Sequence, residues 1–437
     1  MANGSRAEFA ATVSSVRDLL VTRQSATRTT LAGLIGNVLE WFDFAVYGYF
    51  ATDIGRQFFP QSSPTAQQLL AFAVFALGFA TRPVGSLVLG VIGDRLGRRA
   101  LLTFSIALMG AATLAIGLLP TYAQIGLVAP IALVTLRLVQ GFSLGAEFTG
   151  SMVYTTEMAA PRRRGLIGSS STVGASIGFI LGSGSAWLVR ALTSTDTIEW
   201  QWRIPFIGSV LLCVGGWFLR RGLAESAEGM KAASTRPPLL PSLIADWRPM
   251  VQTFGIGAMI NAAYYLMFTF VVERRAHGPG GDAGFLLANT ISLVVVLFSK
   301  VLGGWVSDFT GRRRLMLVLT CMMMAVVYPL LAIMMRGTPG QFLMAQTLFG
   351  IPAGMAGGLQ GAMIVELFPL RTRVTSMSFA YSMMIAITGG TAPLVSAWMI
   401  ARFGHDLAPA YYIFALGLLG IALMRNMRET NERSLSD

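Results

Sequence analysis

Two copies of one short motif decide how this chain is organised. The stretch Gly93–Arg99 reads GDRLGRR, and Ser307–Arg313 reads SDFTGRR, 214 positions later. Each copy separates two apolar stretches and is predicted to form a tight turn between helices, which its glycine permits. The surroundings of Glu157 and Glu366 also resemble each other, since a proline and an arginine follow both acids. A duplicated unit explains both repeats.

The composition indicates that most of the chain lies in lipid. Of its 437 residues, 54% are hydrophobic and 12% are charged. An ordinary soluble protein has about 25% charged residues. The 48 glycines fit the same interpretation, because glycine is common in bilayer helices. These values argue against a soluble globular enzyme.

The apolar stretches are numerous enough for twelve membrane spans. A spanning helix needs about 20 residues, because each residue adds about 1.5 Å along the axis. The predicted fold is an all-α membrane protein with twelve transmembrane helices in two pseudo-symmetric six-helix bundles. The spans are expected near residues 31–55, 68–92, 99–119, 124–156, 165–190, 203–220, 250–272, 283–306, 314–335, 341–365, 374–401 and 408–425.

The longest polar connection divides the chain after the sixth span. Residues 222–248 contain three prolines and several charges, which is typical of a linker. The predicted parts are a cytoplasmic N-terminal segment (1–30), an N-terminal bundle (31–221), the cytoplasmic linker (222–248), a C-terminal bundle (249–426) and a cytoplasmic tail (427–437).

The distribution of basic residues is typical of a membrane protein and not of a nucleic-acid-binding protein. The net charge is +12, but the basic residues lie in short runs between spans and form no single patch. With both termini on one side, that side holds 23 basic residues and the opposite side holds 7. Since Lys and Arg are enriched in cytoplasmic loops, both termini are predicted to be cytoplasmic.

Several kinds of chemistry lack their sequence signals. Cys213 and Cys321 both lie in apolar stretches without a CxxC pair, so no disulfide framework or cysteine metal site is expected. The chain has no phosphate-binding loop ending in Gly-Lys-Ser/Thr and no HExxH motif. His277 and His405 are expected in external loops. We therefore expect no cofactor, no metal and no enzymatic activity.

Several short motifs together resemble one transporter family. They are the two repeated turns, Gly36–Phe44 (GNVLEWFDF), Arg82–Gly85 (RPVG), Arg137–Gly141 (RLVQG), Trp202–Phe206 (WRIPF) and Glu366–Arg373 (ELFPLRTR). This set is similar to the metabolite:proton symporter family of the major facilitator superfamily. The resemblance covers about residues 30–425.

The resemblance implies a function as well as a fold. It implies a secondary transporter in the inner membrane that works by alternating access, functional as a monomer, with lipid, protons and a small solute as partners. We expect proton-coupled symport of a small organic anion, a mono-, di- or tricarboxylate. Uptake of a zwitterion such as betaine or proline, and export or exchange on the same fold, remain alternatives, as does a receptor that transports nothing.

Six ionisable residues are predicted within the spans, where an unpaired charge costs at least about 2.5–3.5 kcal/mol. The proton-coupling candidates are Asp43, Glu40 and Glu147, and the substrate-binding candidates are Arg82, Arg137, Asn37, Gln140, Tyr47, Asn261, Tyr264, Tyr265, Gln346 and Gln360. Successive residues of a helix are about 100° apart around its axis, so the candidates that lie on the same helix are predicted to share one face. The sixth charge, Lys300, is expected to reach the cytoplasmic surface.

Two interpretations of these charges stay open. In the first, they pair with one another and only fix the packing of the helices. In the second, protonation of a carboxylate releases Arg82 or Arg137, whose guanidinium group then binds a substrate carboxylate in a matching planar geometry.

The repeated turns are gate candidates. The family resemblance implies that Asp94, Arg98 and Arg99 hold the cytoplasmic side shut, and their counterparts are Asp308, Arg312 and Arg313. The alternative is that these charges only set the topology. Two glycine patterns complete the analysis: a stripe at Gly174, Gly178 and Gly182 predicts close helix packing, and Gly389 with Gly390 predicts a bend.

Overall fold

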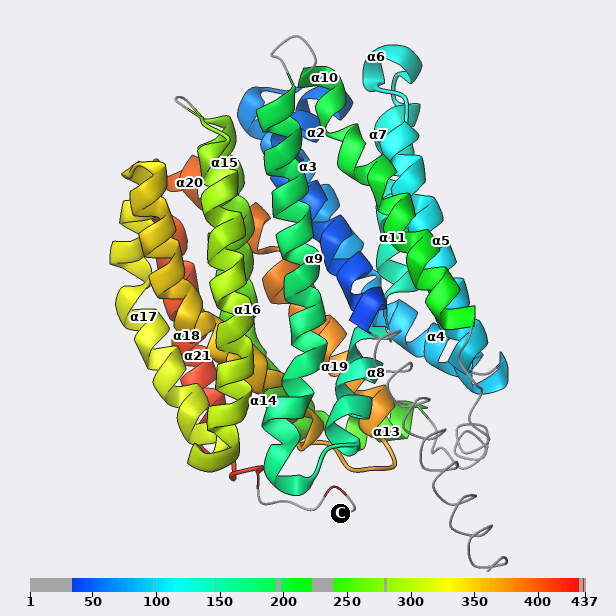
Figure 1. Ribbon diagram of the computed structural model, residues 1–437, viewed down its shortest axis with the longest axis vertical. Helices are drawn as coiled ribbons and strands as arrows, with labels where there is room; N and C mark the ends of the chain where they lie inside the picture. The colour runs from blue at the N-terminus through cyan, green and yellow to red at the C-terminus, as the bar shows by residue number, and fades with distance from the viewer. Residues whose placement is uncertain are drawn as a thin grey trace, which may run out of the picture.

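The computed structural model describes residues 34–96, 98–145, 147–193, 198–221, 239–278, 281–431 and 435, without the side chains of 90–102, 219–221, 239 and 240. Within these residues the chain is helical and contains no strand. Most helices run along the long axis of the molecule (Figure 1). The predicted segments 1–30 and 222–238 lie outside the described residues.

The N-terminal half, residues 34–221, supplies the first six predicted spans. Its helices are residues 34–49, α2 (Ala51–Phe58), α3 (Pro64–Ala80), α4 (Arg82–Leu96), α5 (Arg98–Leu118), α6 (Tyr122–Ile125), α7 (Val128–Ser143), α8 (Glu147–Glu157), α9 (Arg164–Leu192), α10 (Ile198–Gln201) and α11 (Arg203–Arg221). Several spans consist of two helices in sequence. The helix α3 begins after the N-cap residue Ser63, whose side chain accepts a hydrogen bond from Ala66 N.

The C-terminal half, from residue 239 onward, repeats this plan. Its helices are α13 (Leu239–Ala245), α14 (Trp247–Tyr265), α15 (Val271–His277), α16 (Gly284–Thr310), α17 (Arg312–Arg336), α18 (Pro339–Val365), α19 (Arg373–Ile385), α20 (Ala392–Phe403) and α21 (Ala408–Met424). A π-helical turn joins α14 to α15 at Leu266–Phe270, and another follows α19 at Ala386–Gly390. The second turn contains the glycines at which the sequence predicted a bend.

The predicted spans are present. Eight helical segments of the described chain are long and apolar enough to cross a membrane, and three shorter apolar helices accompany them. Together with the helix over residues 34–49 they account for the twelve-helix fold. Part of the predicted linker is helical, since α13 begins at Leu239.

Small residues let the helices approach closely. A Cβ atom on Gly178 would lie 2.5 Å from the Val38 carbonyl oxygen, and one on Gly182 would lie 2.7 Å from Ala45 Cβ. The glycine stripe of α9 therefore packs against the first helix, as the sequence predicted. Across the halves, α9 lies beside α16 (Figure 1), and Gly165 meets Gly304 at their common end.

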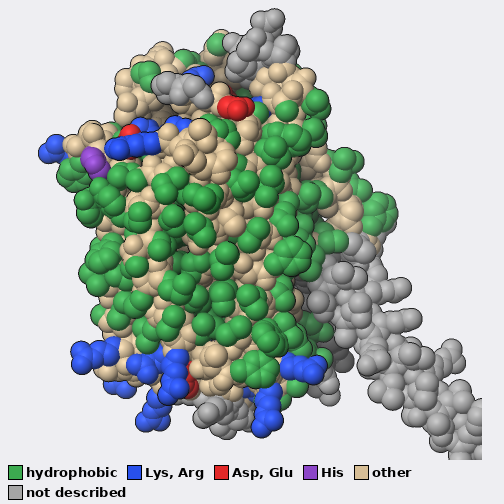
Figure 2. Space-filling model, turned by 60° about the vertical axis from the view of Figure 1, so that its left-hand side comes forward, with side chains coloured by type: hydrophobic (Ala, Val, Ile, Leu, Met, Phe, Trp, Pro, Cys, Tyr) green, Lys and Arg blue, Asp and Glu red, His purple; other side chains and the backbone are tan. Residues whose placement is uncertain are grey.

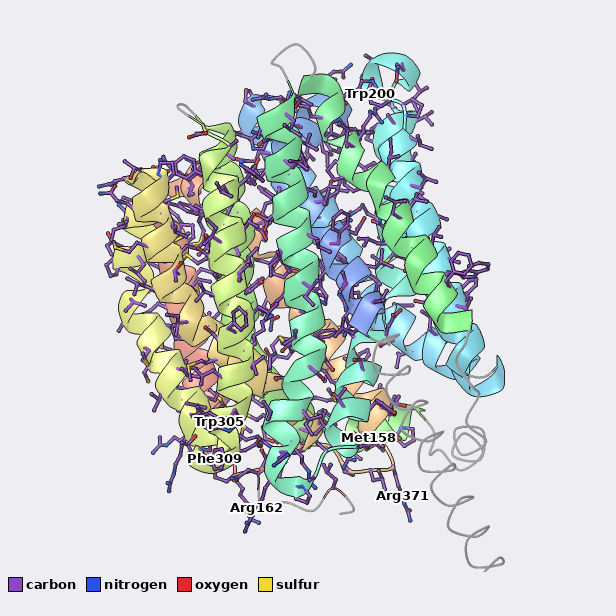
Figure 3. The ribbon with its side chains drawn as sticks, viewed as in Figure 1. Met158, Arg162, Trp200, Trp305, Phe309 and Arg371 are labelled. Carbon is purple, nitrogen blue, oxygen red and sulfur yellow. The ribbon has the colours of Figure 1, made fainter. Side chains whose placement is uncertain are left out.

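The surface has an apolar band between two ends that carry charge. Hydrophobic side chains cover the middle of the molecule in Figure 2, and Lys and Arg side chains lie at both ends, with the broader group at the lower end. We call this end, which carries Arg162 and Arg371, the basic end, and the end that carries Trp200 the distal end (Figure 3).

The packing of α18 on α16 gives a stability prediction. A Cβ atom on Gly358 would lie 1.9 Å from the Lys300 carbonyl oxygen, whereas one on Gly357 would meet Lys300 Cε at an ordinary 3.5 Å. Gly358→Ala should therefore destabilise the protein by about 1–3 kcal/mol through overpacking. Gly357→Ala, the matched control, should leave the thermal unfolding midpoint in detergent nearly unchanged. Equal midpoints for the two variants would contradict this account.

Candidate functional site

A first buried ion pair joins the first helix to α7. Arg137 Nη1 donates to Asp43 Oδ2 at 2.8 Å, and Gln140 Nε2 donates to Asp43 Oδ1 at 2.8 Å. The Arg137 guanidinium also lies 4.1 Å from the centroid of the Tyr47 ring, a cation–π distance. Because Gln140 bonds Thr113 Oγ1 as well, both oxygens of Asp43 are held in a continuous network. The structure thus brings together four predicted residues.

A second buried ion pair joins the first helix to the start of α4. Arg82 Nη2 lies 2.6 Å from Glu40 Oε1, and both side chains are 1% exposed. Arg82 Nε and Nη1 and Glu40 Oε2 have no hydrogen-bond partner among the described residues. Arg137 likewise leaves Nε and Nη2 without a partner, so the two pairs differ at the carboxylate. Asp43 is bonded through both oxygens, whereas Glu40 has a partner for only one.

Aromatic rings from both halves surround the Glu40–Arg82 pair. Trp41 contacts the rings of Phe148, Phe179 and Tyr265 at centroid distances of 5.4, 5.7 and 6.4 Å. The Arg82 guanidinium lies 5.9 Å from the Trp41 ring. We call the connected set the aromatic cluster: Trp41, Phe75, Phe79, Phe148 and Phe179 from the N-terminal half, and Tyr264, Tyr265 and Tyr381 from the C-terminal half.

Several polar atoms in this region are buried without a partner. They include Trp41 Nε1, the hydroxyls of Tyr264 and Tyr265, and Gln360 Nε2. Buried polar groups are normally hydrogen-bonded, so such exceptions need an explanation. Trp41 lies beside the Glu40–Arg82 pair and packs on Tyr265 of the C-terminal half, so the unpartnered N–H and O–H groups of these two residues suit the binding of a polar solute.

The other predicted residues are placed differently. Asn37 donates to the Ser171 carbonyl at 3.2 Å, and Asn261 to the Gly257 carbonyl at 2.8 Å. Gln346 donates to Asn289 Oδ1 at 2.8 Å, and Asn289 in turn donates to the Tyr49 hydroxyl. Gln346 therefore belongs to a network between the halves that sequence reasoning missed.

Glu147 does not continue the face of Arg137. The prediction treated the fourth span as one helix, but α7 ends at Ser143 and α8 begins at Glu147. Gly145 lies in the break, where a Cβ atom would be 2.0 Å from Ser86 N. The chain therefore changes direction where it touches α4, and a count of 100° per residue does not carry across.

The position of Lys300 differs from the expectation that its side chain reaches the cytoplasmic surface. Its side chain does not reach the surface, because the residue is 7% exposed. Its Nζ donates to the Thr172 carbonyl at 3.1 Å and lies 5.3 Å from the centroid of the Tyr264 ring. The ammonium group is thus held between α9 and the aromatic cluster, since the close packing of α16 leaves it no path to the surface.

At the distal end, a buried polar cluster joins the halves. His277 Nε2 lies 2.8 Å from Asp53 Oδ2, and Arg190 lies 3.1 Å from the same oxygen. Glu273 accepts hydrogen bonds from Thr52 and from Gln68. His277 was predicted to lie in an external loop. It instead ends α15 and is buried, because the seventh span continues beyond its apolar stretch.

At the basic end, the second repeated turn reaches across the halves. Asp308 accepts from the backbone N–H groups of Gly165 and Leu166 at 2.8 and 3.0 Å, in the first turn of α9, where such donors have no helical partner. Arg312 supports this contact through Asp308 and through Glu366, to which Arg312 Nε and Nη2 donate at 2.6 and 2.8 Å.

The remaining members of the turns have other places. Gly311 has φ +87°, a conformation that glycine adopts without strain, so the turn that begins α17 needs this residue. Arg313 bonds the Met424 carbonyl and stays within the C-terminal half. The side chains of Asp94, Arg98 and Arg99 lie outside the described residues.

The halves therefore touch at both ends of the molecule. Glu157 and Arg373, which lie in the two repeated acid-and-arginine segments, form an ion pair of 2.7 Å between the halves at the basic end. Together with the distal cluster, this contact encloses the aromatic cluster between two closed ends.

The Asp308 contact can be tested as a closure of the basic end. Asp308→Asn removes the charge and places an amide N–H₂ before two N–H donors, so the halves should separate there. A charge-assisted hydrogen bond contributes about 1.5–3 kcal/mol, which predicts at least about a 10-fold shift toward the open state. Distances between spin labels at Met158 and Phe309 would show it, in a background without Cys213 and Cys321.

A matched control is Asp282→Asn, because Asp282 caps Gly284 N within the C-terminal half alone. Its distance distribution should equal that of the unsubstituted protein. An unchanged distribution in Asp308→Asn would remove Asp308 from the closure.

Comparisons with known proteins agree with this architecture. The family model described as sugar (and other) transporter matches residues 29–227, and the one described as Major Facilitator Superfamily matches residues 280–435. Among solved structures, the proton:xylose symporter XylE bound to a glucose analogue has a TM-score of 0.76 at 16% identity, covering 95% of this chain and 98% of that one. This likeness concerns the fold alone.

Curated relatives cover nearly the whole chain. A proline/betaine transporter of Salmonella typhimurium is 31% identical over 92% of this chain and 84% of its own length. The proline/betaine transporter of Escherichia coli K12 is 30% identical, over 96% and 87%. The inner membrane metabolite transport protein YhjE of the same organism is 35% identical, over 94% and 96%. The chain is thus a multi-pass inner-membrane transporter and not an enzyme, and it belongs to the major facilitator superfamily, as a member of the metabolite:proton symporter type.

Proposed function

We propose that this protein takes up a small zwitterion, of the betaine or proline kind, together with a proton. The observation that carries the proposal is the aromatic cluster at the contact of the halves, with a buried carboxylate and unpartnered polar atoms beside it. The names of two relatives support it. This order reverses the expectation from the sequence, which placed organic anions first.

The aromatic cluster suits the cationic part of such a solute. Ring faces attract a quaternary or secondary ammonium group, with about 0.5–2 kcal/mol from each favourable contact. Trp41 supplies the largest ring, and Tyr265 of the C-terminal half packs beside it. A purely anionic solute would gain nothing from these faces.

Glu40 is the proton site that the geometry favours. Its carboxylate has one ionic partner, Arg82, and lies at the aromatic cluster, so its protonation dissolves the pair where the solute binds. Asp43 is bonded through both oxygens, to Arg137 and Gln140. We assign that second pair to the packing of the first helix on α7.

Transport then follows from alternating closure of the two ends. The basic end is assigned to the cytoplasm, because cytoplasmic loops are rich in Lys and Arg. Protonation and binding from the distal side precede release at the basic end, which requires the Asp308 and Glu157 contacts to open.

Proteoliposomes test the proposal and separate the two solute classes. A zwitterion with one proton moves one net charge, so an imposed potential of 100 mV, inside negative, should support about 40-fold accumulation. A monoanion with one proton moves no net charge and would respond to the pH gradient alone. Labelled glycine betaine, proline, citrate and 2-oxoglutarate should be compared. Uptake of either acid, without betaine uptake, would overturn the proposal.

Glu40→Gln should uncouple transport from the proton. The glutamine mimics the protonated acid and cannot release a proton, so exchange of labelled for unlabelled betaine should persist while accumulation driven by a pH gradient falls at least about 10-fold, toward equilibration. Asp43→Asn is the comparison, because it should lower the thermal unfolding midpoint. Accumulation that survives in Glu40→Gln would exclude this residue as the coupling site.

A further inference from the structure

We infer that Lys300 binds the carboxylate of the transported solute, so that the solute lies at the contact between the halves with its cationic end against the rings of the aromatic cluster. This inference rests on the proposed function for the solute class. It concerns a residue that the sequence gave no role in the site.

The bonding of Lys300 carries the first step. An ammonium group has three N–H donors, and the structure shows one hydrogen bond from Nζ, to the Thr172 carbonyl. No described carboxylate lies within ion-pair distance of Nζ, whereas Arg82 and Arg137 each have one. Lys300 is 7% exposed. A buried cation without a countercharge is costly, and a substrate carboxylate would supply the countercharge.

The surroundings of Nζ carry the second step. The Tyr264 ring lies 5.3 Å from Nζ, and its hydroxyl is buried without a partner. Ser176 lies one turn beyond Thr172 on the same face of α9, and its hydroxyl is also buried without a partner. Both hydroxyls are donors of the kind that completes the hydrogen bonding of a carboxylate.

The distribution of charge carries the third step. Of the six ionisable residues predicted within the spans, the N-terminal half holds three carboxylates and two guanidinium groups, and the C-terminal half holds Lys300. At the aromatic cluster, the N-terminal half supplies the rings around Trp41 for a cationic group, and the C-terminal half supplies the Lys300 ammonium group for an anionic one. A zwitterion matches this arrangement, and each of its ends would then be held by a different half.

The two cations also lie beside different rings of the aromatic cluster. Ring contacts lead from Trp41, beside Arg82, through Phe179 to Tyr264, beside Lys300, at centroid distances of 5.7 and 5.0 Å. Arg82 is already neutralised by Glu40. As long as Glu40 is ionised, Lys300 is consequently the stronger attraction for a further carboxylate.

The test compares Lys300→Met with Arg82→Met in purified protein. Equilibrium binding of labelled glycine betaine gives the Kd, and competition by choline, which has the same trimethylammonium group without a carboxylate, gives its Ki. In Lys300→Met the Kd for betaine should rise between about 10-fold and 100-fold, the range for one charged hydrogen bond. The Ki for choline should stay equal or fall, because a repulsive charge has been removed. Ser299→Ala, whose hydroxyl bonds only its own helix, is the control.

Two results would overturn the inference: a betaine Kd within 3-fold of the unsubstituted protein, or a parallel loss of choline binding. A selective loss of betaine in Arg82→Met, without one in Lys300→Met, would assign the carboxylate to Arg82 instead. If Lys300→Met does not fold, Lys300→Arg retains the charge and must retain the preference for betaine over choline.

The proposed function is tested separately by the unsubstituted protein. If it binds a carboxylic acid and not betaine, the zwitterion proposal fails, and the Lys300 comparison is made with that acid and its methyl ester. Selective loss of the acid in Lys300→Met would then support Lys300 as the carboxylate partner, and equal binding of acid and ester would reject it.

Discussion

Ionised side chains at bilayer depth must be neutralised, and this constraint organises the centre of the molecule. Two carboxylates of the first helix meet it through Arg82 and Arg137, at 2.6 and 2.8 Å. These pairs hold the first helix against α4 and α7. Their surroundings differ at the carboxylates, because Asp43 is bonded through both oxygens while Glu40 Oε2 has no hydrogen-bond partner among the described residues. One pair is suited to packing and the other to a change of state.

The same constraint connects binding to movement. A solute or proton that alters the Glu40–Arg82 pair changes contacts at the interface of the halves, because Tyr265 of the C-terminal half packs on Trp41. The ends of the interface are held by separate polar contacts, around Asp308 and around Asp53. A local change of charge can therefore favour closure of one end of the molecule over closure of the other. In the same way, a ligand shifts an equilibrium between two states when it binds them with different affinities.

Close backbone contacts fix the relative positions of the helices around the interface between the halves. Gly165 meets Gly304 across the halves, and within the C-terminal half Gly358 of α18 fits against the Lys300 carbonyl of α16. Because lipid provides no hydrophobic driving force between helices, the close van der Waals packing that small residues permit stabilises their association. Lys300 is held beside the aromatic cluster by this packing and not by an ionic partner.

The sequence determined the number and order of the helices, because about 20 apolar residues suffice to predict a span without knowledge of its neighbours. It also identified the repeated turns and placed Arg137 and Gln140 on one face of their helix, but it did not assign Asp43 as their partner. It did not predict the aromatic cluster, the distal contact of His277 with Asp53, or the burial of Lys300, whose partners lie more than a hundred positions away along the chain. Tertiary structure decided these, since helical periodicity defines the face of one helix but not the helix that it meets.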